Sequence, residues 1–387
     1  MKAETVLFGL LRDEVCGGKA KDNFIQALSP LEAQQLFELS RQHDLAHIAG
    51  HSLKRRGMQL PEALQQKFTK QVNLAIYRSL QLQRMYDQLC QVLEQAQVAF
   101  IPLKGAVIRQ LYPQSWMRTS SDIDILVQEA DVPAAVDALV KLGYDNKGRN
   151  TYDVSLFSPA GMHVELHFNL ITDYVSKRQG QVLKQVWETS QPVAGKKYHR
   201  QMSDGLFYFF HMAHMAKHIH NGGCGVRPLL DTWLLNHRME ANRQAREELL
   251  EKGGLLTFAR QMENLAEVWF SGKTPDETAD MVTAYILDNG VYGTRSRGIA
   301  NKQTEQGRGK YFLSRVFVPY ERLKLRYPVL QKHKWLLPFY QVARWFGLLF
   351  NGGVKRAARE VKADQKLSEE ERLFSARLLK DLGLDDR

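Results

Sequence analysis

The chain has 387 residues, of which 44% are hydrophobic and 25% are charged. This length favours more than one domain, and the composition excludes a disordered or a fibrous chain. Lysine and arginine number 53 against 42 aspartates and glutamates, a formal net charge of +11. The excess lies in one segment, because residues 302–359 contain 13 basic and two acidic residues. A general basic coat for nucleic acid is therefore disfavoured, and a local surface that faces an anion is favoured.

The cysteine and hydropathy patterns bear on the compartment. The three cysteines lie far apart and form no Cys-x-x-Cys pair, which fits a reducing compartment. The N-terminal segment lacks the basic flank and small-residue cleavage site of a signal peptide. The longest apolar-rich stretch, 335–350, is shorter than the roughly 20 residues that span a bilayer. We expect a cytoplasmic protein, with peripheral binding at the inner membrane face as an open alternative.

Residues 1–97 are predicted to form a helical region. Ser29, Pro30 and Glu32 fit a capping box with proline at the first helical position. From Pro61 to Gln97, apolar residues recur at steps of three and four, and no glycine or further proline interrupts them. This spacing predicts one long amphipathic helix with a single buried stripe.

Residues 98–170 have a different pattern, of short apolar strands between short helices. Strands are predicted at 98–103, 121–127, 152–157 and 162–168. Short helices are predicted to begin at Lys104 and Val132. A Ser-Pro-Ala-Gly turn joins the last two strands as a hairpin. We predict an α+β fold in which this small mixed β-sheet is flanked by an N-terminal helical region, 1–97, and a C-terminal helical domain, 171–387.

The C-terminal region is predicted to be helical again. The predicted helices cover 204–219, 227–239, 243–269, 275–288, 332–359 and 368–382. Residues 290–309 contain five glycines and several basic residues, which predicts an exposed, mobile loop. The segment 332–359 mixes aromatic and basic residues, and we expect it to pack into the core. A helix on an anionic membrane surface, or a surface for a partner or nucleic acid, stays open as an alternative.

A group of carboxylates carries the strongest chemical signal. Asp122 and Asp124 stand at positions i and i+2 of a predicted strand, so their side chains share one face about 6.6–7 Å apart. Glu165 alternates in the same way on a later strand and joins them if the two strands are neighbours. Two close carboxylates repel each other unless a cation lies between them. Mg²⁺ prefers oxygen ligands and keeps sites open for substrate phosphates, which suits this set.

Two basic residues are candidate phosphate ligands. Lys104-Gly105 lies between a predicted strand and helix, where glycine allows close backbone approach and the helix start offers free N–H groups. Arg118 carries a planar guanidinium suited to phosphate. An isolated Asp-x-Asp or Leu-Lys-Gly pattern arises often by chance, so the prediction depends on their combination.

This combination resembles nucleotidyltransferase family 5, an uncharacterised bacterial branch of the DNA polymerase beta-like nucleotidyltransferase superfamily. The resemblance is carried by Leu103–Ala106, Leu111–Pro113, Arg118, Asp122–Val127, Gly143-Tyr144 and Val164–His167. It implies that Asp122 and Asp124 bind two Mg²⁺ ions, one carrying the NTP, and that Glu165 completes a metal site and prepares the acceptor hydroxyl. It also implies that the turn at Gly105 cradles the phosphates. The candidate nucleotide-binding residues are Lys104, Gly105, Arg118 and Ser121.

Several polar residues are secondary candidates for the cleft. They are His167, His214, His218, Arg227 and Asp231. His211, His214 and His218 share one helix face, but no cysteine or carboxylate on that face completes a set of metal ligands, so a cleft lining or buried hydrogen bonds are favoured over a metal site. A zinc trio of His163, Glu165 and His167, and with it a zinc hydrolase, is a weaker alternative. Arg227 and Asp231 are four residues apart, so they form either an internal ion pair or a site in which Arg227 faces phosphate.

We therefore predict a magnesium-dependent nucleotidyltransferase that moves an NMP group from an NTP to an unknown hydroxyl or phosphate acceptor, with ATP as the favoured donor. The alternative is a non-catalytic module with the transferase fold that docks RNA or an anionic membrane through residues 302–359. No Walker A, Gly-x-Ser-x-Gly or His-Glu-x-x-His motif occurs, so other common hydrolase classes are unsupported.

Overall fold

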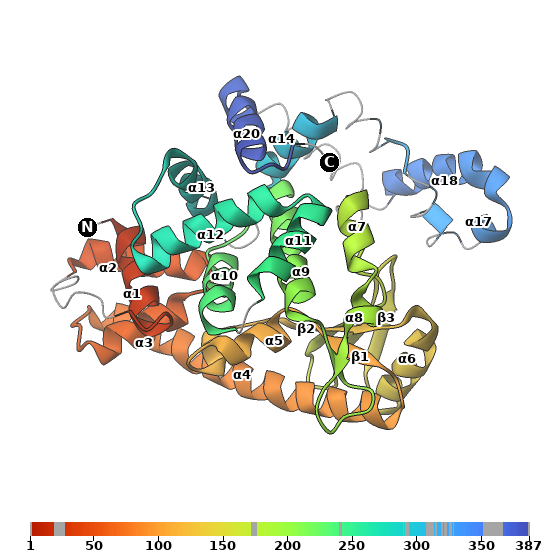
Figure 1. Cartoon of the computed structure of the whole chain (residues 1–387), viewed down its shortest axis with the longest axis horizontal. Helices are drawn as coiled ribbons and strands as arrows, with labels where there is room; N and C mark the ends of the chain where they lie inside the picture. Colours follow the sequence, from red (N-terminus) through yellow and green to blue (C-terminus); the bar gives the residue numbers. More distant parts are fainter. Residues whose placement is uncertain are drawn as a thin grey trace. The chain divides into compact units, whose positions relative to one another are not determined.

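The structure is a computed structural model of the chain (Figure 1). It describes residues 2–18, 28–171, 176–239, 242–288, 290, 294–306, 313, 316–318, 320, 323–324, 327, 329–350 and 367–385. The chain forms two compact units, Met1–Met215 with Cys224–Val291, and Ala216–Gly223 with Tyr292–Arg387. The predicted α+β class, a mixed sheet flanked by helices, is confirmed. The division at residues 97 and 170 stays a prediction.

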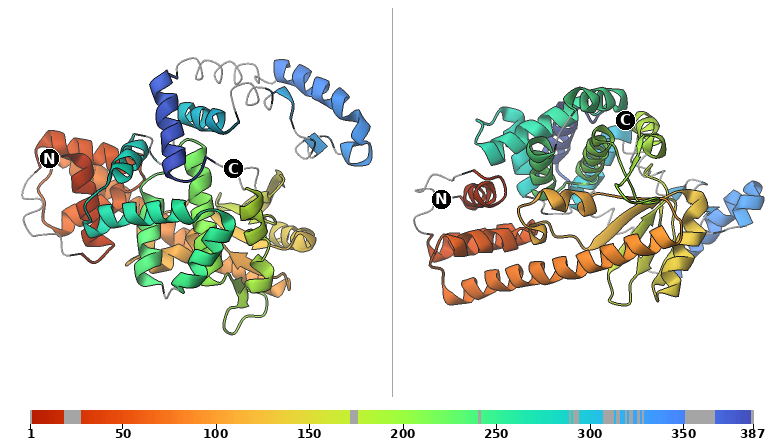
Figure 2. Two further views of the ribbon diagram at one scale, coloured as in Figure 1. Left: turned by 45° about the horizontal axis from the view of Figure 1, so that its top comes forward. Right: turned by 60° about the horizontal axis from the view of Figure 1, so that its bottom comes forward.

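The first unit begins with helices. They are α1 (Ala3–Glu14), α2 (Pro30–Gln42), α3 (Ala46–Arg55) and α4 (Glu62–Gln95). The capping box predicted at α2 is present, because the Ser29 hydroxyl accepts from the Glu32 amide and the Glu32 carboxylate accepts from the Ser29 amide. The predicted long helix is α4, which at 34 residues is about 51 Å long. It runs from the N-terminal helices along the sheet (Figure 2).

The described residues contain a five-stranded mixed sheet in the order β1-β2-β5-β4-β3. Its strands are β1 (Phe100–Pro102), β2 (Asp122–Val127), β3 (Asp145–Arg149), β4 (Asp153–Phe157) and β5 (His163–His167). β2 and β5 run parallel, and the other neighbours are antiparallel. β3 was not predicted. All five of its residues are exposed, so this edge strand has no hydrophobic alternation.

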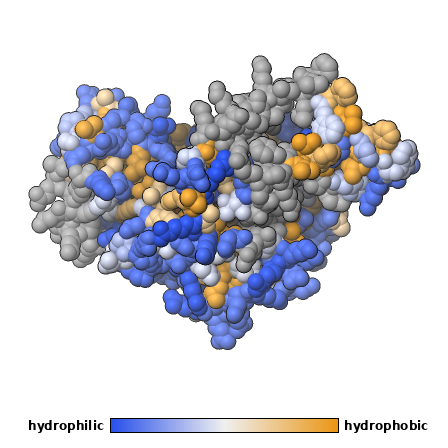
Figure 3. Space-filling view, turned by 90° about the horizontal axis from the view of Figure 1, so that it is seen from above, coloured by the Kyte–Doolittle hydropathy of each residue, from blue (hydrophilic) through white to orange (hydrophobic). Residues whose placement is uncertain are grey.

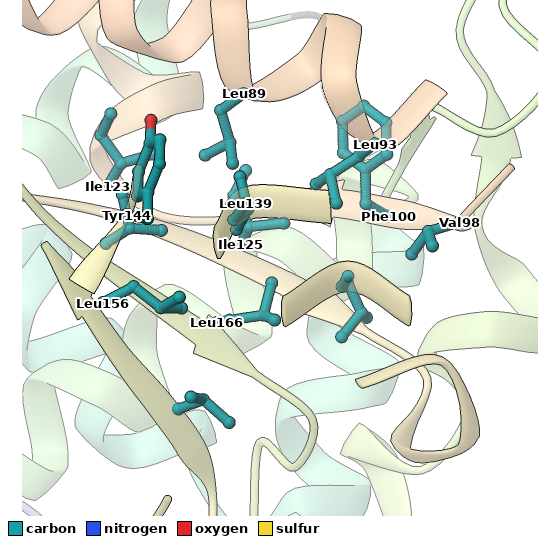
Figure 4. Packing of buried hydrophobic residues seen from close by; sticks show 14 of the residues in the cluster. Leu89, Leu93, Val98, Phe100, Ile123, Ile125, Leu139, Tyr144, Leu156 and Leu166 are labelled. Carbon is teal, nitrogen blue, oxygen red and sulfur yellow. The ribbon is translucent and has the colours of Figure 1, made fainter. Parts of the chain in front are cut away.

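Short helices connect these strands. They are α5 (Gly105–Ile108), η1 (Arg109–Leu111), η2 (Ser115–Met117), η3 (Glu129–Asp131) and α6 (Val132–Lys141). α4 and α6 cover one face of the sheet, where their leucines pack on the apolar side chains of the strands (Figure 4). Ile123, Ile125, Val164 and Leu166 all belong to this core. Because side chains alternate along a strand, the residues between them point to the other face of the sheet.

Helices and a small second sheet complete the first unit. They are α7 (Lys177–Leu183), α8 (Val186–Thr189), β6 (Gln191–Pro192), β7 (Arg200–Gln201), α10 (Arg227–Arg238), α11 (Arg243–Gly253), α12 (Leu256–Ser271) and α13 (Glu277–Leu287); α9 (Asp204–His220) contributes to both units. The single helix predicted over 243–269 is wrong. Gly254 takes a left-handed conformation, with φ of 70°, that ends α11 and separates it from α12.

The described part of the second unit contains α14 (Arg295–Gln306), α17 (Val329–Lys332), η4 (Lys334–Leu336), α18 (Leu337–Phe350) and α20 (Glu369–Asp381). The loop predicted over 290–309 is wrong for Arg295–Gln306, which is helical. Its Ile299 and Ala300 are buried with Leu367, and Asn301 donates to the backbone oxygen of Ile219 at 2.8 Å. This packing outweighs the low helix propensity of a glycine-containing segment.

The predicted basic segment, 302–359, falls only partly on described residues. The helix predicted over 332–359 begins as α17 and η4 and continues as α18 to Phe350, and residues 351–366 lie outside the described part. Its predicted core packing is wrong for Trp335, Phe339 and Phe346, which are 69%, 66% and 60% exposed. None of the helices in the described part combines the length and the apolar character needed to cross a bilayer.

Candidate functional site

The carboxylates meet on the face of the sheet opposite α4 and α6. In the parallel pairing of β2 with β5, Asp122 lies opposite His163, Asp124 opposite Glu165, and Leu126 opposite His167. The predicted neighbourhood of the two strands is thus confirmed. Asp124 is buried, whereas Asp122 and Glu165 are partly accessible. Three carboxylates and two histidines therefore lie together on two adjacent strands.

Asp124 is held by two cationic side chains. Its Oδ1 accepts from the Lys104 ammonium at 3.0 Å, and His167 Nε2 lies 2.8 Å from the same oxygen. Burial alone would raise the pKa of Asp124, but the charges of Lys104 and His167 outweigh it and hold the pKa below its ordinary value of 3.8. Burial likewise opposes the charged form of His167, but hydrogen bonds to Asp124 and Glu165 raise its pKa. Asp124 is therefore a carboxylate with its charge locally balanced.

The backbone of Lys104 directs this contact. Lys104 has φ of 42° and ψ of −112°, in the positive-φ region that residues with a side chain rarely adopt. It stands between β1 and α5, and the ammonium reaches Asp124 on the neighbouring strand β2. Burial opposes the charge of Lys104, but Asp124 outweighs this and raises the lysine pKa. Such strain is typical of functional positions.

The donor atoms form two overlapping groups that fit a metal ion. One group is Asp122, His163 and Glu165, and the other is Asp124, Glu165 and His167. Within each group, one ligand atom from every residue lies within 4.8 Å of the others. Two carboxylates and one imidazole in each group suit a divalent cation. His163, weighed in the sequence only as part of a zinc trio, belongs to the first group, and its Nε2 lies 2.8 Å from the Ser155 hydroxyl.

A serine supports Asp122. The Ser120 hydroxyl lies 2.9 Å from both the carbonyl and the carboxylate oxygen of Asp122. Ser121, the residue predicted to bind nucleotide, is exposed at the start of β2. The sequence pattern offers two adjacent serines and no signal to choose between them, so Ser120 was missed. A nucleotide contact by Ser121 stays a prediction.

Arg118 lies in a buried polar cluster, and its Nη1 is close to Gly105. Its Nη2 and Nε donate to the Asp231 carboxylate at 2.9 and 3.3 Å, and the Tyr112 hydroxyl donates to the same carboxylate at 2.7 Å. The Arg118 and Asp231 side chains are 11% and 3% exposed. A Cβ on Gly105 would lie 2.9 Å from Arg118 Nη1, so any side chain there would displace the guanidinium that Asp231 holds. A phosphate contact by Arg118 stays a prediction.

Arg227 joins the N-terminal helical region to the segment before β2. It forms an ion pair with Asp44 and donates to the backbone oxygen of Thr119 at 3.2 Å. Thr119 in turn donates from its hydroxyl to Asp44 at 2.7 Å. The alternative of an ion pair between Arg227 and Asp231 is wrong, because each has a different partner that is distant in the sequence. Arg227 and Asp231 therefore fix the chain around Arg118–Thr119 from two sides.

The predicted histidine face of α9 is not a metal cluster among the described residues. His211 Nε2 lies 2.9 Å from the Thr232 hydroxyl, which supports the buried hydrogen-bond alternative. His214 is partly buried beside the ring of Phe210. His218 belongs to the second unit. Of the secondary candidates, His167 joins the carboxylates directly, and a role for His214 and His218 stays a prediction.

Comparison with known proteins identifies the family. The model of the family described as uncharacterised nucleotidyltransferase matches residues 29–271. No curated protein and no solved structure matches the chain. The matched residues cover more than half of the chain and include the whole five-stranded sheet with its carboxylates. The chain therefore belongs to this nucleotidyltransferase family, which supports a transferase role.

Proposed function

We propose that the protein is a magnesium-dependent nucleotidyltransferase that transfers an NMP group from an NTP, with ATP favoured, to a hydroxyl or phosphate acceptor. In this reaction the acceptor oxygen bonds to the α-phosphorus, the bond to pyrophosphate breaks, and a hydroxyl acceptor loses its proton. The observation that carries the proposal is the register of β2 with β5, which brings Asp122, Asp124 and Glu165 to one face.

Asp122, Asp124 and Glu165 are the residues that we assign to the metal, and His163 and His167 adjoin them. The cation would supply positive charge beside the triphosphate. Asp124 is 6% exposed and already balanced by Lys104 and His167, which suits a fixed ligand. Glu165 is 29% exposed, so it is the carboxylate that we assign to the acceptor proton.

Lys104 and Gly105 are the residues that we assign to the phosphates. The Lys104 ammonium lies beside Asp124, and Gly105 begins α5 directly after it. A metal ion bound to Asp124 would displace the Lys104 ammonium from that carboxylate. Movement of the ammonium to a substrate phosphate would then keep the lysine charge paired. Arg118 is held by Asp231, so we assign it to positioning the segment before β2, with its Nη1 toward Gly105.

The test compares charge removal at the site with charge removal elsewhere on the same sheet. The protein is incubated with each α-³²P-labelled NTP, Mg²⁺ and a cell extract as the acceptor source. We expect acceptor labelling by the wild type and its loss in Asp124→Asn. Asp145→Asn is the matched control, because Asp145 is an exposed carboxylate on the edge strand β3.

Two measurements separate the possible outcomes. Mn²⁺ binding, followed by the electron paramagnetic resonance of the free ion, should weaken in Asp124→Asn and persist in Asp145→Asn. Equal labelling by the wild type and Asp124→Asn would refute the catalytic assignment. Absence of metal-dependent NTP binding, together with salt-sensitive binding to RNA or anionic vesicles that Asp124→Asn leaves unchanged, would favour the non-catalytic module.

A further inference from the structure

The segment from η4 through α18 exposes its apolar side chains. Trp335, Phe339, Val342 and Phe346 are 69%, 66%, 42% and 60% exposed. We call these four residues the aromatic stripe. They follow one another at steps of four, three and four, the spacing that places side chains on one side of a helix. Hydrophobic residues gather at the right-hand edge of the space-filling view, where this segment lies (Figure 3).

The opposite side of α18 buries polar side chains. Gln341 and Arg344 are 6% and 8% exposed. The Gln341 amide donates to the backbone oxygen of Val318 at 2.5 Å and accepts from its amide at 3.3 Å. Arg344 Nη2 donates to the backbone oxygen of Val316 at 2.5 Å. The helix is therefore inverted relative to a core helix, with polar groups inward and aromatic rings outward.

These hydrogen bonds fix which side faces out. Rotation of α18 to bury the aromatic stripe would remove the partners of Gln341 and Arg344, and a buried polar group without a partner is costly. The Trp345 indole nitrogen also donates to the backbone oxygen of Val316, at 2.9 Å. An exposed run of large apolar side chains held in this way is typical of a surface that contacts something else.

The charges around the stripe indicate the partner. Lys332 and Lys334 are exposed directly before it, and the sequence continues after α18 with Lys355, Arg356 and Arg359, which lie outside the described residues. No aspartate or glutamate occurs from Arg322 to Arg359. Aromatic residues on one helix face, with exposed lysines before them in a stretch of sequence without acidic residues, suit the headgroup region of an anionic bilayer.

The arrangement favours lipid over RNA. Single-stranded RNA is bound by basic residues interleaved with aromatic rings on one surface. Here the arginine within α18, Arg344, is buried on the side away from the stripe. With 14 residues, α18 is too short to cross a bilayer, so it would lie in the plane of the interface.

We propose that the aromatic stripe, with Lys332 and Lys334 beside it, forms a docking surface for an anionic lipid bilayer. Phe339 and Phe346 enter the headgroup region, and Lys332 and Lys334 contact the lipid phosphates. The proposal concerns the second unit and does not depend on the proposed transferase activity.

The test measures binding of the full chain to vesicles. We use flotation with vesicles of phosphatidylcholine containing 30% phosphatidylglycerol, and with phosphatidylcholine alone. The variant Phe339→Glu/Phe346→Glu places two acidic groups in the stripe. The control Leu31→Glu/Leu80→Glu changes two leucines of the first unit that are each 68% exposed. All four residues are exposed, so both variants should keep the wild-type circular dichroism.

We expect the wild type and the control to float with the anionic vesicles, less so at high salt, and the stripe variant to bind about tenfold more weakly or not at all. The fluorescence of Trp335, isolated by comparison with Trp335→Phe, should shift to shorter wavelength on binding. Equal binding of stripe variant and control, or no binding by the wild type, would overturn the proposal. Stripe-dependent binding to single-stranded RNA or stripe-dependent dimerisation, without vesicle binding, would also overturn it.

Discussion

Replacement of Arg118 by methionine should destabilise the protein because it leaves the Asp231 carboxylate without its counter-charge. In the wild type, two guanidinium nitrogens and the Tyr112 hydroxyl contact this carboxylate, which is 3% exposed. Removal of one partner from a buried ion pair costs about 3–5 kcal/mol. The Tyr112 hydrogen bond survives the change, so we expect a loss of about 3 kcal/mol in the free energy of unfolding.

A double variant separates the ion pair from the packing. Arg118→Met/Asp231→Leu removes both charges, and exchange of a buried pair for apolar residues is often neutral. We therefore expect the double variant to be more stable than Arg118→Met by about 2 kcal/mol, measured by urea unfolding at pH 7. Arg41→Met is the matched control, because the exposed Arg41–Glu38 pair should contribute less than about 1 kcal/mol.

The pH dependence of the same series tests the positioning role of Arg118. If Arg118 acts by holding the segment before β2, Arg118→Met should lower the free energy of unfolding at pH 7. The difference in this free energy between the variant and the wild type should become smaller as the pH falls toward 3. The Asp231 pKa lies below its ordinary value of 3.8 in the folded protein, so the pair stabilises above that pH and its contribution disappears as acid protonates the carboxylate. A variant as stable as the wild type at pH 7, or a double variant less stable than Arg118→Met, would refute the reasoning.

Three further perturbations test the surroundings of the site. Gly105→Ala places a Cβ 2.9 Å from Arg118 Nη1 and should cost about 1–3 kcal/mol of unfolding free energy, but almost nothing in the Arg118→Met background. Lys104→Met removes the cation that competes for Asp124 and should tighten Mn²⁺ binding about tenfold, so weaker binding would contradict this role. Burial lowers the pKa of His47 to about 4 from 6.5, so the unfolded chain binds the proton more readily than the folded one. The free energy of unfolding should therefore fall by up to about 3 kcal/mol between pH 6.5 and 4. In urea unfolding at several pH values, His47→Gln should flatten this decline, and an unchanged slope would exclude His47 as its source.

The sheet was predictable where each strand has one buried face. Alternation placed Asp122 and Asp124 on the side opposite Ile123 and Ile125, and the core confirms it. β3 was not predictable in this way, because a fully exposed edge strand carries no hydrophobic signal. In α14, glycine and arginine content indicated a loop, whereas burial of Ile299 depends on Leu367, a contact that local sequence cannot report.

The site was predictable to the extent that strand register determines it. The approach of Lys104 to Asp124 depends on a backbone conformation with positive φ at a residue that is not glycine. The partner of Arg118 lies 113 positions away in the chain, so spacing could not identify Asp231. The i, i+4 spacing suggested an ion pair between Arg227 and Asp231. That prediction was wrong because each residue pairs with a side chain distant in the sequence, Asp44 and Arg118 respectively.

The parallel pairing of β2 with β5 also has a consequence for the order of folding. β4 and β5 are joined by a short turn and can pair early, because little chain entropy is lost in closing it. Asp124 and His167 are 43 positions apart, and their contact requires closure of a segment that includes α6, β3 and β4. Long-range pairing of this kind is slow to form. Glu165 therefore reaches Asp122 and Asp124 only through this long-range pairing, and Lys104 and His167 offset the repulsion among the three carboxylates.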